Sequence, residues 1–549
     1  MSSTARGRTP LLRTALIGTA FAVTVALSAC SGGTAGTGTA TDTDADPVVG
    51  GDLTFAIAND PISLNPSGTG AGNDTLYVTR QLVDSLLYQN PETNELEPWL
   101  ATGWEANADA TEFTFTLRDD VTFSDGSPFT AADVKATFDD ILAAGAKSQA
   151  VSSFVGFQES TVVDDHTLRV TFSTPNAAFP NSTSSVALGI VGPATLAVPF
   201  DDRANGAAVV GTGPFVLGTY TKDVETVIER RDGYAWSPAS RDLDGEAYLD
   251  SVTFQVVPEP AVRTGSLTSG QVDVIGGVQP VDVDTLTASN FPLVTRGNPG
   301  VSFGVYFNES SPIVSDIVVR EAIARATNAE EIRDTSLNDE FNVGTSILAA
   351  TTPGYADQSE YFEFAPAAAE SLLDDAGWEL GDDGIRAKDG ERLSLVVNWI
   401  TNFGPNQTSL ELLQQQLKDV GVELTLQGGD VPSFLEKQTS GEFDISWQNL
   451  SRADGDVLRT TFSSAATNTL RIDDPTLEAL LQEQLATGDQ AARATVLADA
   501  QERIASQYYQ IPVHELTSIL ATQPGVGGVT LGADSRLDQL TGAWTAAAE

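Results

Sequence analysis

The sequence is poor in the residue types that most catalytic and metal sites need. It has one cysteine, Cys30, and two histidines, His166 and His514. A single cysteine excludes a disulfide bond within the chain, and two histidines cannot build a three-histidine zinc site. We therefore interpret both histidines as structural, and we expect no cofactor and no bound metal.

Basic residues are also scarce. The 549 residues include 29 lysines and arginines against 75 aspartates and glutamates, which gives a formal net charge of −46. A surface this acidic repels the phosphate backbone of nucleic acids, so we exclude nucleic acid as a partner. The acidic residues indicate a well-solvated exterior. A hydrophobic content of 41% is enough for more than one core.

Motifs of nucleophilic and phosphate chemistry are missing as well. The sequence has no Gly-x-Ser-x-Gly motif, and the glycine-rich segment 211–215 lacks the lysine of a phosphate-binding loop. Acidic pairs such as Asp139-Asp140 and Asp374-Asp375 are expected in turns and on helix faces of so acidic a chain. These absences favour a binding protein over an enzyme.

The N-terminus has the pattern of an export signal. Arg6, Arg8 and Arg13 precede an apolar run from Thr14 to Leu27. A basic region and a short apolar core with small residues before a cleavage site describe a secretory signal peptide, and the run is too short for a comfortable membrane span. We therefore predict a signal peptide over residues 1–29.

The cysteine stands at the end of this segment. Leu27-Ser28-Ala29-Cys30 resembles the bacterial lipobox, whose cysteine is lipidated and becomes the first mature residue. The alternative is a plain signal peptide with a chance cysteine. Residues 30–49, rich in small and polar residues, are typical of a flexible tether. The pattern predicts a lipid-anchored protein on the outer face of the cytoplasmic membrane, extracellular or periplasmic.

From Gly50 onward the chain mixes strand and helix patterns. Alternation over 113–117, followed by Val121 and Phe123, predicts a β-hairpin, and a capping box at Thr130 predicts the start of a helix. The alternation of strands and helices predicts an α/β protein with largely parallel pairing. Further expected elements are a helix over 410–420 that ends at Gly421, a strand over 422–426, a helix over 431–438, a strand over 443–447, a helix over 496–508 and a strand over 511–516.

A series of short motifs spans nearly all of the mature chain. The most specific covers residues 113–134. The others are 53–56, 60–66, 83–88, 96–104, 211–215, 269–274, 306–308, 319–323, 369–378 and 441–444. In this order they resemble the extracellular solute-binding proteins of family 5, a group that includes the dipeptide-, oligopeptide- and nickel-binding proteins of ABC importers.

This resemblance implies a bilobal α/β fold of the periplasmic-binding-protein type, with hinge crossover strands and an extra subdomain inserted in lobe 1. It implies that residues 306–308 and 511–513 are the hinge crossings. It also implies that the protein is a monomer that delivers a small ligand to a membrane permease. The implied boundaries are 50–90, 208–300 and 509–549 for a discontinuous lobe 1, 91–207 for the inserted subdomain and 301–508 for lobe 2.

The resemblance also implies where the ligand binds. In peptide-binding relatives, the loop after the Gly-x-Phe-Asp strand carries a tryptophan and then an aspartate that holds the α-amino group of the peptide. Here Leu450 holds the usual tryptophan position, and Asp454 falls one place beyond the usual aspartate. Asp454 is the candidate amine anchor. Arg452 is a candidate partner for Asp454 or for a ligand carboxylate, and a salt-bridged surface loop is the alternative.

The predicted function is a substrate-binding lipoprotein of an ABC importer that captures short peptides. The alternatives are the same fold binding an oligosaccharide or a metal chelate, and a peptide receptor without transport. Trp447 has a competing interpretation as a core residue, because a tryptophan in a strand is usually buried. The candidate ligand-binding residues are Asp454, Arg452, Asn449, Trp447, Asn402, Phe403, Leu64 and Asn65, with Cys30 as the lipidation site.

Overall fold

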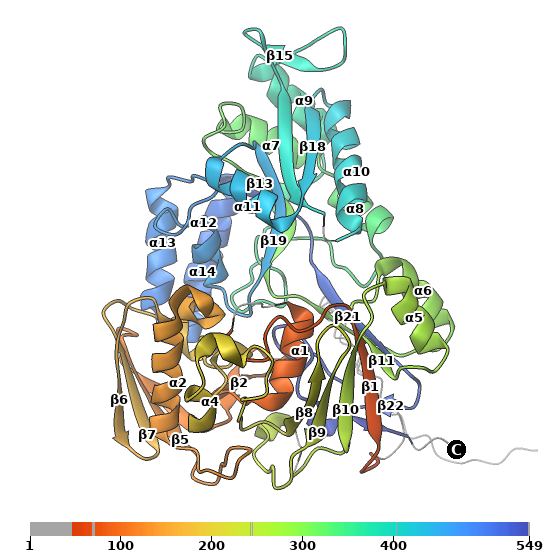
Figure 1. Cartoon of the computed structure of the whole chain (residues 1–549). Helices are drawn as coiled ribbons and strands as arrows, with labels where there is room; N and C mark the ends of the chain where they lie inside the picture. The colour runs from red at the N-terminus through yellow and green to blue at the C-terminus, as the bar shows by residue number, and fades with distance from the viewer. Residues whose placement is uncertain (1–46, 69–71, 242, 244, 402, 547–549) are drawn as a thin grey trace, which may run out of the picture. The chain divides into compact units, whose positions relative to one another are not determined.

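The computed structural model of the chain describes residues 47–68, 72–241, 243, 245–401 and 403–546 (Figure 1). The predicted signal peptide, Cys30 and Asn402 lie outside the described residues. In the described part, no helix is both long enough and apolar enough to cross a membrane.

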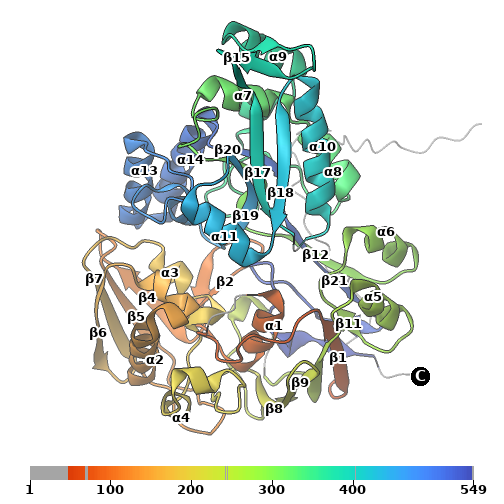
Figure 2. The same cartoon turned by 45° about the horizontal axis from the view of Figure 1, so that its top comes forward.

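The largest sheet has seven strands that come from segments far apart in the sequence. Its central strand, β1, pairs in parallel with β10 on one side and with β11 on the other. Helices α1 (Asn73–Leu82) and α5 (Pro260–Thr268) pack against it, and α6 (Pro280–Ala288) follows α5 (Figures 1 and 2). We call this assembly lobe 1. In spatial order its strands are β12 (Leu293–Gly297), β21 (Thr517–Thr522), β11 (Val274–Ile275), β1 (Asp52–Ile57), β10 (Ser251–Val256), β9 (Glu225–Arg230) and β8 (Phe215–Thr221).

A second sheet, of four strands, lies beside lobe 1. Its strands all come from the sequence interval that we predicted as an inserted subdomain. Helix α2 (Ala131–Ala144) covers it and begins with the predicted capping box, in which the carboxylate of Asp133 accepts hydrogen bonds from the backbone N and Oγ1 of Thr130 at 2.9 and 2.7 Å. The core is aromatic, and Phe179 packs against five other phenylalanine rings. The strands are β4 (Ala101–Ala106), β5 (Glu112–Leu117), β7 (Thr167–Phe172) and β6 (Phe157–Asp164).

A five-stranded sheet forms the centre of the other lobe, which we call lobe 2. Its strands are β18 (Glu423–Gly429), β17 (Ser394–Ile400), β19 (Ile445–Ser451), β13 (Gly300–Phe307) and β20 (Gln510–His514). Its helices are α7 (Ile317–Ala326), α8 (Ala329–Ser336), α9 (Pro366–Asp375), α10 (Pro405–Asp419), α11 (Val431–Ser440), α12 (Val457–Phe462), α13 (Pro475–Ala486) and α14 (Gln490–Ser506).

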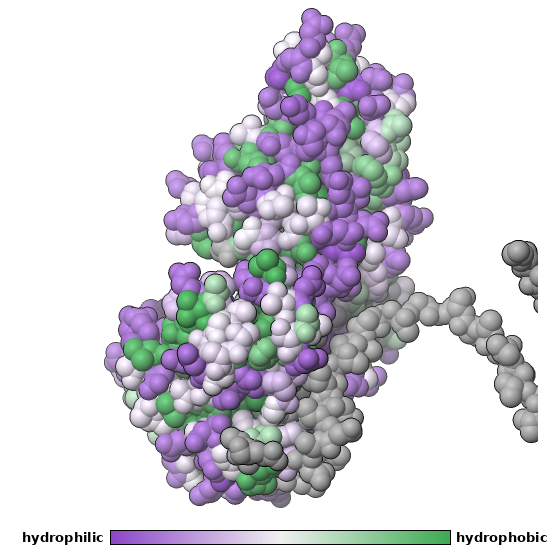
Figure 3. All heavy atoms as spheres, turned by 90° about the vertical axis from the view of Figure 1, so that its right-hand side faces the viewer, coloured by the Kyte–Doolittle hydropathy of each residue, from purple (hydrophilic) through white to green (hydrophobic). Residues whose placement is uncertain are grey.

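Short elements complete the fold. They are α3 (Phe179–Ser182), α4 (Pro193–Leu196), the pair β2 (Leu87–Gln89) and β3 (Leu96–Pro98), the pair β22 (Val526–Gly527) and β23 (Trp544–Thr545), and the small sheet of β14 (Glu379–Leu380), β15 (Arg386–Lys388) and β16 (Glu391–Arg392). On the face drawn in Figure 3, hydrophilic residues predominate and hydrophobic residues form small separate patches, as the acidic composition predicts.

The local elements agree with the sequence patterns, but two predictions of pairing are wrong. Among the named strands, only β1 with β10 and β11, and β17 with β18 and β19, pair in parallel. The helical crossovers around β17 to β19 give parallel pairs, whereas short turns such as the one between β8 and β9 give antiparallel pairs. The predicted hairpin is also absent: β5 pairs with β4 and β7, while Val121 and Phe123 are buried in a loop.

The chain passes between the two large sheets at two points that lie side by side. It leaves lobe 1 between β12 and β13 and returns between β20 and β21. The backbone N of Asn298 donates to the carbonyl of Leu516 at 2.6 Å, and the Oγ of Ser518 donates to the Oδ1 of Asn298 at 2.9 Å. Residues 306–308 and 511–513, which we expected at the crossings, instead belong to or adjoin β13 and β20 inside lobe 2.

One of these crossings begins beside a buried histidine. His514 ends β20, has no exposed surface, and stacks on Phe303 with ring centroids 5.0 Å apart. Burial lowers the pKa of His514 to about 4. The imidazole is therefore neutral at pH 7, which agrees with the structural role that we predicted for it.

The pH dependence of folding should report this burial. Because the pKa of His514 is lower in the folded than in the unfolded chain, the unfolded chain binds more protons between the ordinary histidine pKa of about 6.5 and about 4. As the pH falls through that window, this one site should lower the free energy of unfolding by up to about 1.4 kcal/mol per pH unit. Urea unfolding between pH 7 and 4.5 should show a shallower dependence for His514→Phe than for the wild type. Identical slopes would show that His514 does not titrate in this way.

Candidate functional site

A cavity of about 920 Å³ lies between lobe 1, the four-stranded subdomain and lobe 2. This volume falls within the range of about 300–1,000 Å³ that is typical of small-molecule sites. Lobe 1 and its C-terminal return contribute Arg80, Gln89 and residues 532–534 and 536–538, and the subdomain contributes residues around 149–155 and 174–188. Lobe 2 contributes the loop after β19, residues 451–456, together with parts of α12 and α13.

Direct hydrogen bonds hold the 451–456 loop against the other walls of the cavity. The carbonyl oxygen of Ala453 accepts from the Nε2 of Gln89 at 3.0 Å and from the Nδ2 of Asn181 at 3.3 Å. The backbone N of Arg452 donates to the carbonyl of Pro299 at 3.1 Å. The loop is thus fixed to lobe 1, to the subdomain and to the crossing between β12 and β13.

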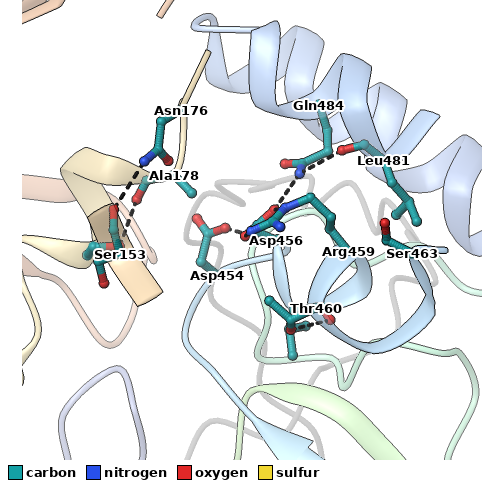
Figure 4. A network of polar contacts seen from close by, with 12 residues as sticks. Ser153, Asn176, Ala178, Asp454, Asp456, Arg459, Thr460, Ser463, Leu481 and Gln484 are labelled. Atoms are coloured by element: carbon teal, nitrogen blue, oxygen red, sulfur yellow. Dashed lines mark hydrogen bonds and ion pairs between the residues drawn. The ribbon is translucent and has the colours of Figure 1, made fainter. Parts of the chain in front are cut away.

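A network of charged side chains forms the lobe 2 wall (Figure 4). Arg493 donates from Nη1 and Nη2 to both carboxylate oxygens of Asp454, at 2.8 and 2.6 Å, and also donates to the Oε1 of Gln484. The Nε2 of Gln484 donates to the Oδ1 of Asp456 at 2.6 Å, and Arg459 donates to both oxygens of the same carboxylate. Gln484 therefore joins two bidentate ion pairs into one connected unit.

Burial and charge act in opposite directions within this network. Burial by itself would lower the pKa of Arg493, but the charge and hydrogen bonds of Asp454 raise it, so that the guanidinium remains protonated. Burial raises the pKa of Asp456, and the hydrogen bond and charge of Arg459 oppose that rise. Each of these carboxylates already has its cation within the protein.

Asp454 and Arg452, the two predicted site residues in the loop, both line the cavity. They do not pair with each other: Asp454 pairs with Arg493, and the Nη1 of Arg452 donates to the carbonyl of Ser451 at 3.0 Å. The amine-anchor role of Asp454 remains a prediction, but a ligand amine would have to compete with the guanidinium of Arg493. In the part of the cavity nearest to this loop, the guanidinium of Arg452 is the charged group that a ligand can reach.

The other described candidates do not line this cavity. Trp447 is buried, and its indole N donates to the Oδ1 of Asn406 at 3.0 Å, so its position fits the core interpretation. Asn449 lies in β19, Phe403 stacks on Phe303, and Leu64 belongs to the lobe 1 core. Asn65 is also buried.

Several residues of the cavity were not found from the sequence. Arg80 comes from α1, and Arg536 comes from the C-terminal segment, far from the motif-bearing loop. No motif marks either of them. The only hint in the sequence was the scarcity of basic residues. With 29 lysines and arginines in so acidic a chain, each arginine could have been considered as a candidate for a specific role.

The two histidines lie away from this cavity. His166 lies in the turn between β6 and β7, as predicted from its flanking strand patterns. In the described part of the chain, no group of three or more histidine, cysteine, aspartate and glutamate side chains is arranged to hold a metal ion.

Comparison with known proteins gives consistent similarities. Residues 95–468 match the family described as bacterial extracellular solute-binding proteins, family 5 Middle. The chain is 24% identical over 508 residues to the nickel-binding periplasmic protein of Escherichia coli K12, covering 87% of this chain and 93% of that protein. It is 24% identical over 492 residues to the periplasmic oligopeptide-binding protein OppA of the same strain, covering 82% and 85%.

A solved structure shows the same fold. The crystal structure of NikA from Brucella suis in complex with Fe(III)-EDTA superposes with a TM-score of 0.79 at 24% sequence identity. The match covers 90% of this chain and all of that one. The bilobal α/β architecture that we predicted is thereby confirmed.

The ion pair of Asp454 with Arg493 should contribute to stability. Their side chains are only 15% and 3% exposed, so Asp454→Ala would leave a guanidinium buried without its anion. We expect the free energy of unfolding to fall by about 3 kcal/mol, measured by urea unfolding followed through tryptophan fluorescence. Asp120→Ala, which breaks the more exposed pair with Arg118, is the control and should change stability little. Equal effects of the two substitutions would contradict this assignment.

Proposed function

Because the chain belongs to the bacterial extracellular solute-binding proteins of family 5, we propose that it captures short peptides for an ABC importer. The observation that carries the proposal is the cavity of about 920 Å³, whose walls come from both lobes and from the subdomain. Closure of two lobes around a ligand is a general mode of capture in proteins of this architecture. The protein would bind its solute outside the membrane and present it to the permease.

The choice of peptides rests on the cavity lining and on one relative. The lining includes serine, asparagine, glutamine and arginine side chains together with alanine, leucine and valine. Such a lining can hydrogen-bond a peptide backbone while it accepts varied side chains. The relative OppA, which aligns over 82% of this chain, is an oligopeptide-binding protein.

A metal chelate is the second candidate, because another relative is a nickel-binding protein. The described residues contain no cluster of side chains that could hold a bare metal ion. A metal would therefore have to arrive with its own organic ligands. Such a chelate would be held in the cavity by hydrogen bonds and charge from the polar side chains of the lining.

Mass spectrometry of the ligand released from natively purified protein tests the proposal. We expect a series of short peptides, and calorimetric titration with the synthetic forms should reproduce saturable binding. Acetylation of the peptide N-terminus then tests the predicted amine anchor, since a contact with Asp454 requires a free amine. A bound glycan or chelate, with no response to any peptide, would replace the peptide assignment and retain the role in solute capture.

We also propose that Cys30 carries the lipid that anchors the protein to the membrane. The lipobox-like sequence supports this, and acyl chains contribute about 0.8 kcal/mol of membrane affinity for each buried methylene. Cys30→Ser should move the protein from the membrane fraction to the soluble fraction and abolish labelling by radioactive palmitate. Retention of the Cys30→Ser protein in the membrane fraction would contradict the lipid anchor.

A further inference from the structure

A short segment of lobe 2 is seated in lobe 1. Residues 337–342, which we call the strap, follow α8 of lobe 2 and reach the part of lobe 1 formed by α5, α6 and β21. Leu337 and Phe341 are only 9% and 2% exposed, and both belong to an apolar cluster with side chains of these lobe 1 elements. The lobe 1 members include Leu267 of α5, Leu286 of α6 and Ile519 of β21. Among the apolar clusters of the described residues, this one alone combines buried side chains of both lobes.

Hydrogen bonds also attach the strap to lobe 1. The Nδ2 of Asn338 donates to the carbonyl of Pro280, at the start of α6, at 2.9 Å. The Oγ1 of Thr517, at the start of β21, donates to the carbonyl of Glu340 at 2.9 Å. The chain then returns to lobe 2, where it pairs with the end of β20. The strap is therefore a third connection between the lobes, beside the two crossings.

The lobes also meet at a second place, where the contacts are polar. In Figures 1 and 2, α13 lies next to the subdomain at one side of the molecule, and α5 and α6 lie beside lobe 2 at the other. The backbone N of Ala177 in the subdomain donates to the carbonyl of Leu485, in the last turn of α13, at 2.9 Å. The Ala453 carbonyl accepts from Gln89 and Asn181, as described above. We call these three hydrogen bonds the polar contact.

The strap and the polar contact differ in how strongly they resist separation. A hydrogen-bonding group that becomes exposed exchanges its partner for water, so a polar contact between the lobes is lost at little net cost. Apolar side chains have no such replacement, because their exposure to water is unfavourable. Withdrawal of the strap would expose Leu337 and Phe341 and leave a cavity among α5, α6 and β21. The polar contact is therefore the weaker of the two.

The large cavity lies against the polar contact. Its lining includes Gln89, Asn181, Ala453 and Leu485, which all take part in the polar contact, but none of the described residues of the strap. Separation of the lobes at the polar contact would thus open the cavity directly to solvent. Separation at the strap would leave these walls of the cavity in place.

We propose that the strap stays seated in lobe 1 while the lobes separate, so that the cavity opens only at the polar contact, between α13 and the subdomain. The strap and the two crossings then act together as one joint, and a solute enters and leaves on the side of α13. This inference concerns the route of a solute into the cavity, and it rests on the proposed function.

Distances between spin labels on the intact chain test the inference. Cys30→Ser leaves a chain without cysteine, so pairs of new cysteines can be labelled and measured by double electron–electron resonance. The first pair, Val163→Cys with Thr476→Cys, spans the polar contact from the subdomain to α13. The second pair, Thr285→Cys with Thr335→Cys, spans the strap from α6 to α8. All four native residues are exposed.

The decisive variant weakens the polar contact without any ligand. Gln89→Ala together with Asn181→Ala removes two of its three hydrogen bonds. In this double variant we expect the distance between the subdomain and α13 to lengthen, and the distance between α6 and α8 to keep its wild-type value and width. Equal changes in both distances, a larger change across the strap, or no change in either would overturn the inference.

A second variant tests the strap itself. Phe341→Ala should broaden the distribution of distances between α6 and α8, because the shortened side chain no longer fills the lobe 1 cluster. Phe364→Ala, at a residue 45% exposed, is the matched control and should leave both distributions unchanged. No broadening in Phe341→Ala, or equal broadening in the control, would show that the strap does not hold the joint. If Phe341→Ala does not fold, the double variant decides the inference by itself.

Peptide capture is judged separately, by native mass spectrometry of the wild type with a random tetrapeptide library. Absence of bound peptides would contradict peptide capture, while the double variant would still show on which side the lobes separate. Bound peptides together with equal lengthening of both distances in the double variant would overturn the strap and leave peptide capture intact.

Discussion

The arrangement of the cavity depends on the place where the chain crosses twice between the two large sheets. The outgoing and returning segments hydrogen-bond to each other through Asn298, Leu516 and Ser518. Gly300 begins β13 with a φ of +118°, and a Cβ atom there would come within 2.1 Å of the carbonyl oxygen of Leu450. A residue without a side chain thus lets β13 approach β19 closely at its first position.

This constraint reaches the cavity directly. The end of β19 leads into the 451–456 loop, and Arg452 donates its backbone N to Pro299, within the outgoing crossing. The loop that lines the cavity is therefore attached to the segment about which the lobes would have to rotate. Any change at the crossing should alter the position of Arg452 relative to Arg80 and Arg536, which lie on the lobe 1 side.

Local patterns predicted the local structure, whereas contacts between distant segments escaped them. The apolar stripe at 410–420 became α10, and the capping box at Thr130 began α2, because each depends on residues within a few positions. The partner of Asp454 lies 39 residues away, beyond any helical or strand period, and Arg536 enters the site from the C-terminal segment. Sequence spacing cannot show such pairings, so the motif indicated a loop that lines the cavity but not the ion pair within it.

The double hydrogen bond to the carbonyl of Ala453 bears on the separation of the lobes. Gln89 lies in lobe 1 and Asn181 in the subdomain, so both bonds cross to the loop of lobe 2 and would have to break when the lobes move apart. Water can replace each partner once it is exposed, so each bond favours the joined arrangement by only about 0.5–1.5 kcal/mol. A latch of this strength holds the lobes together without locking them.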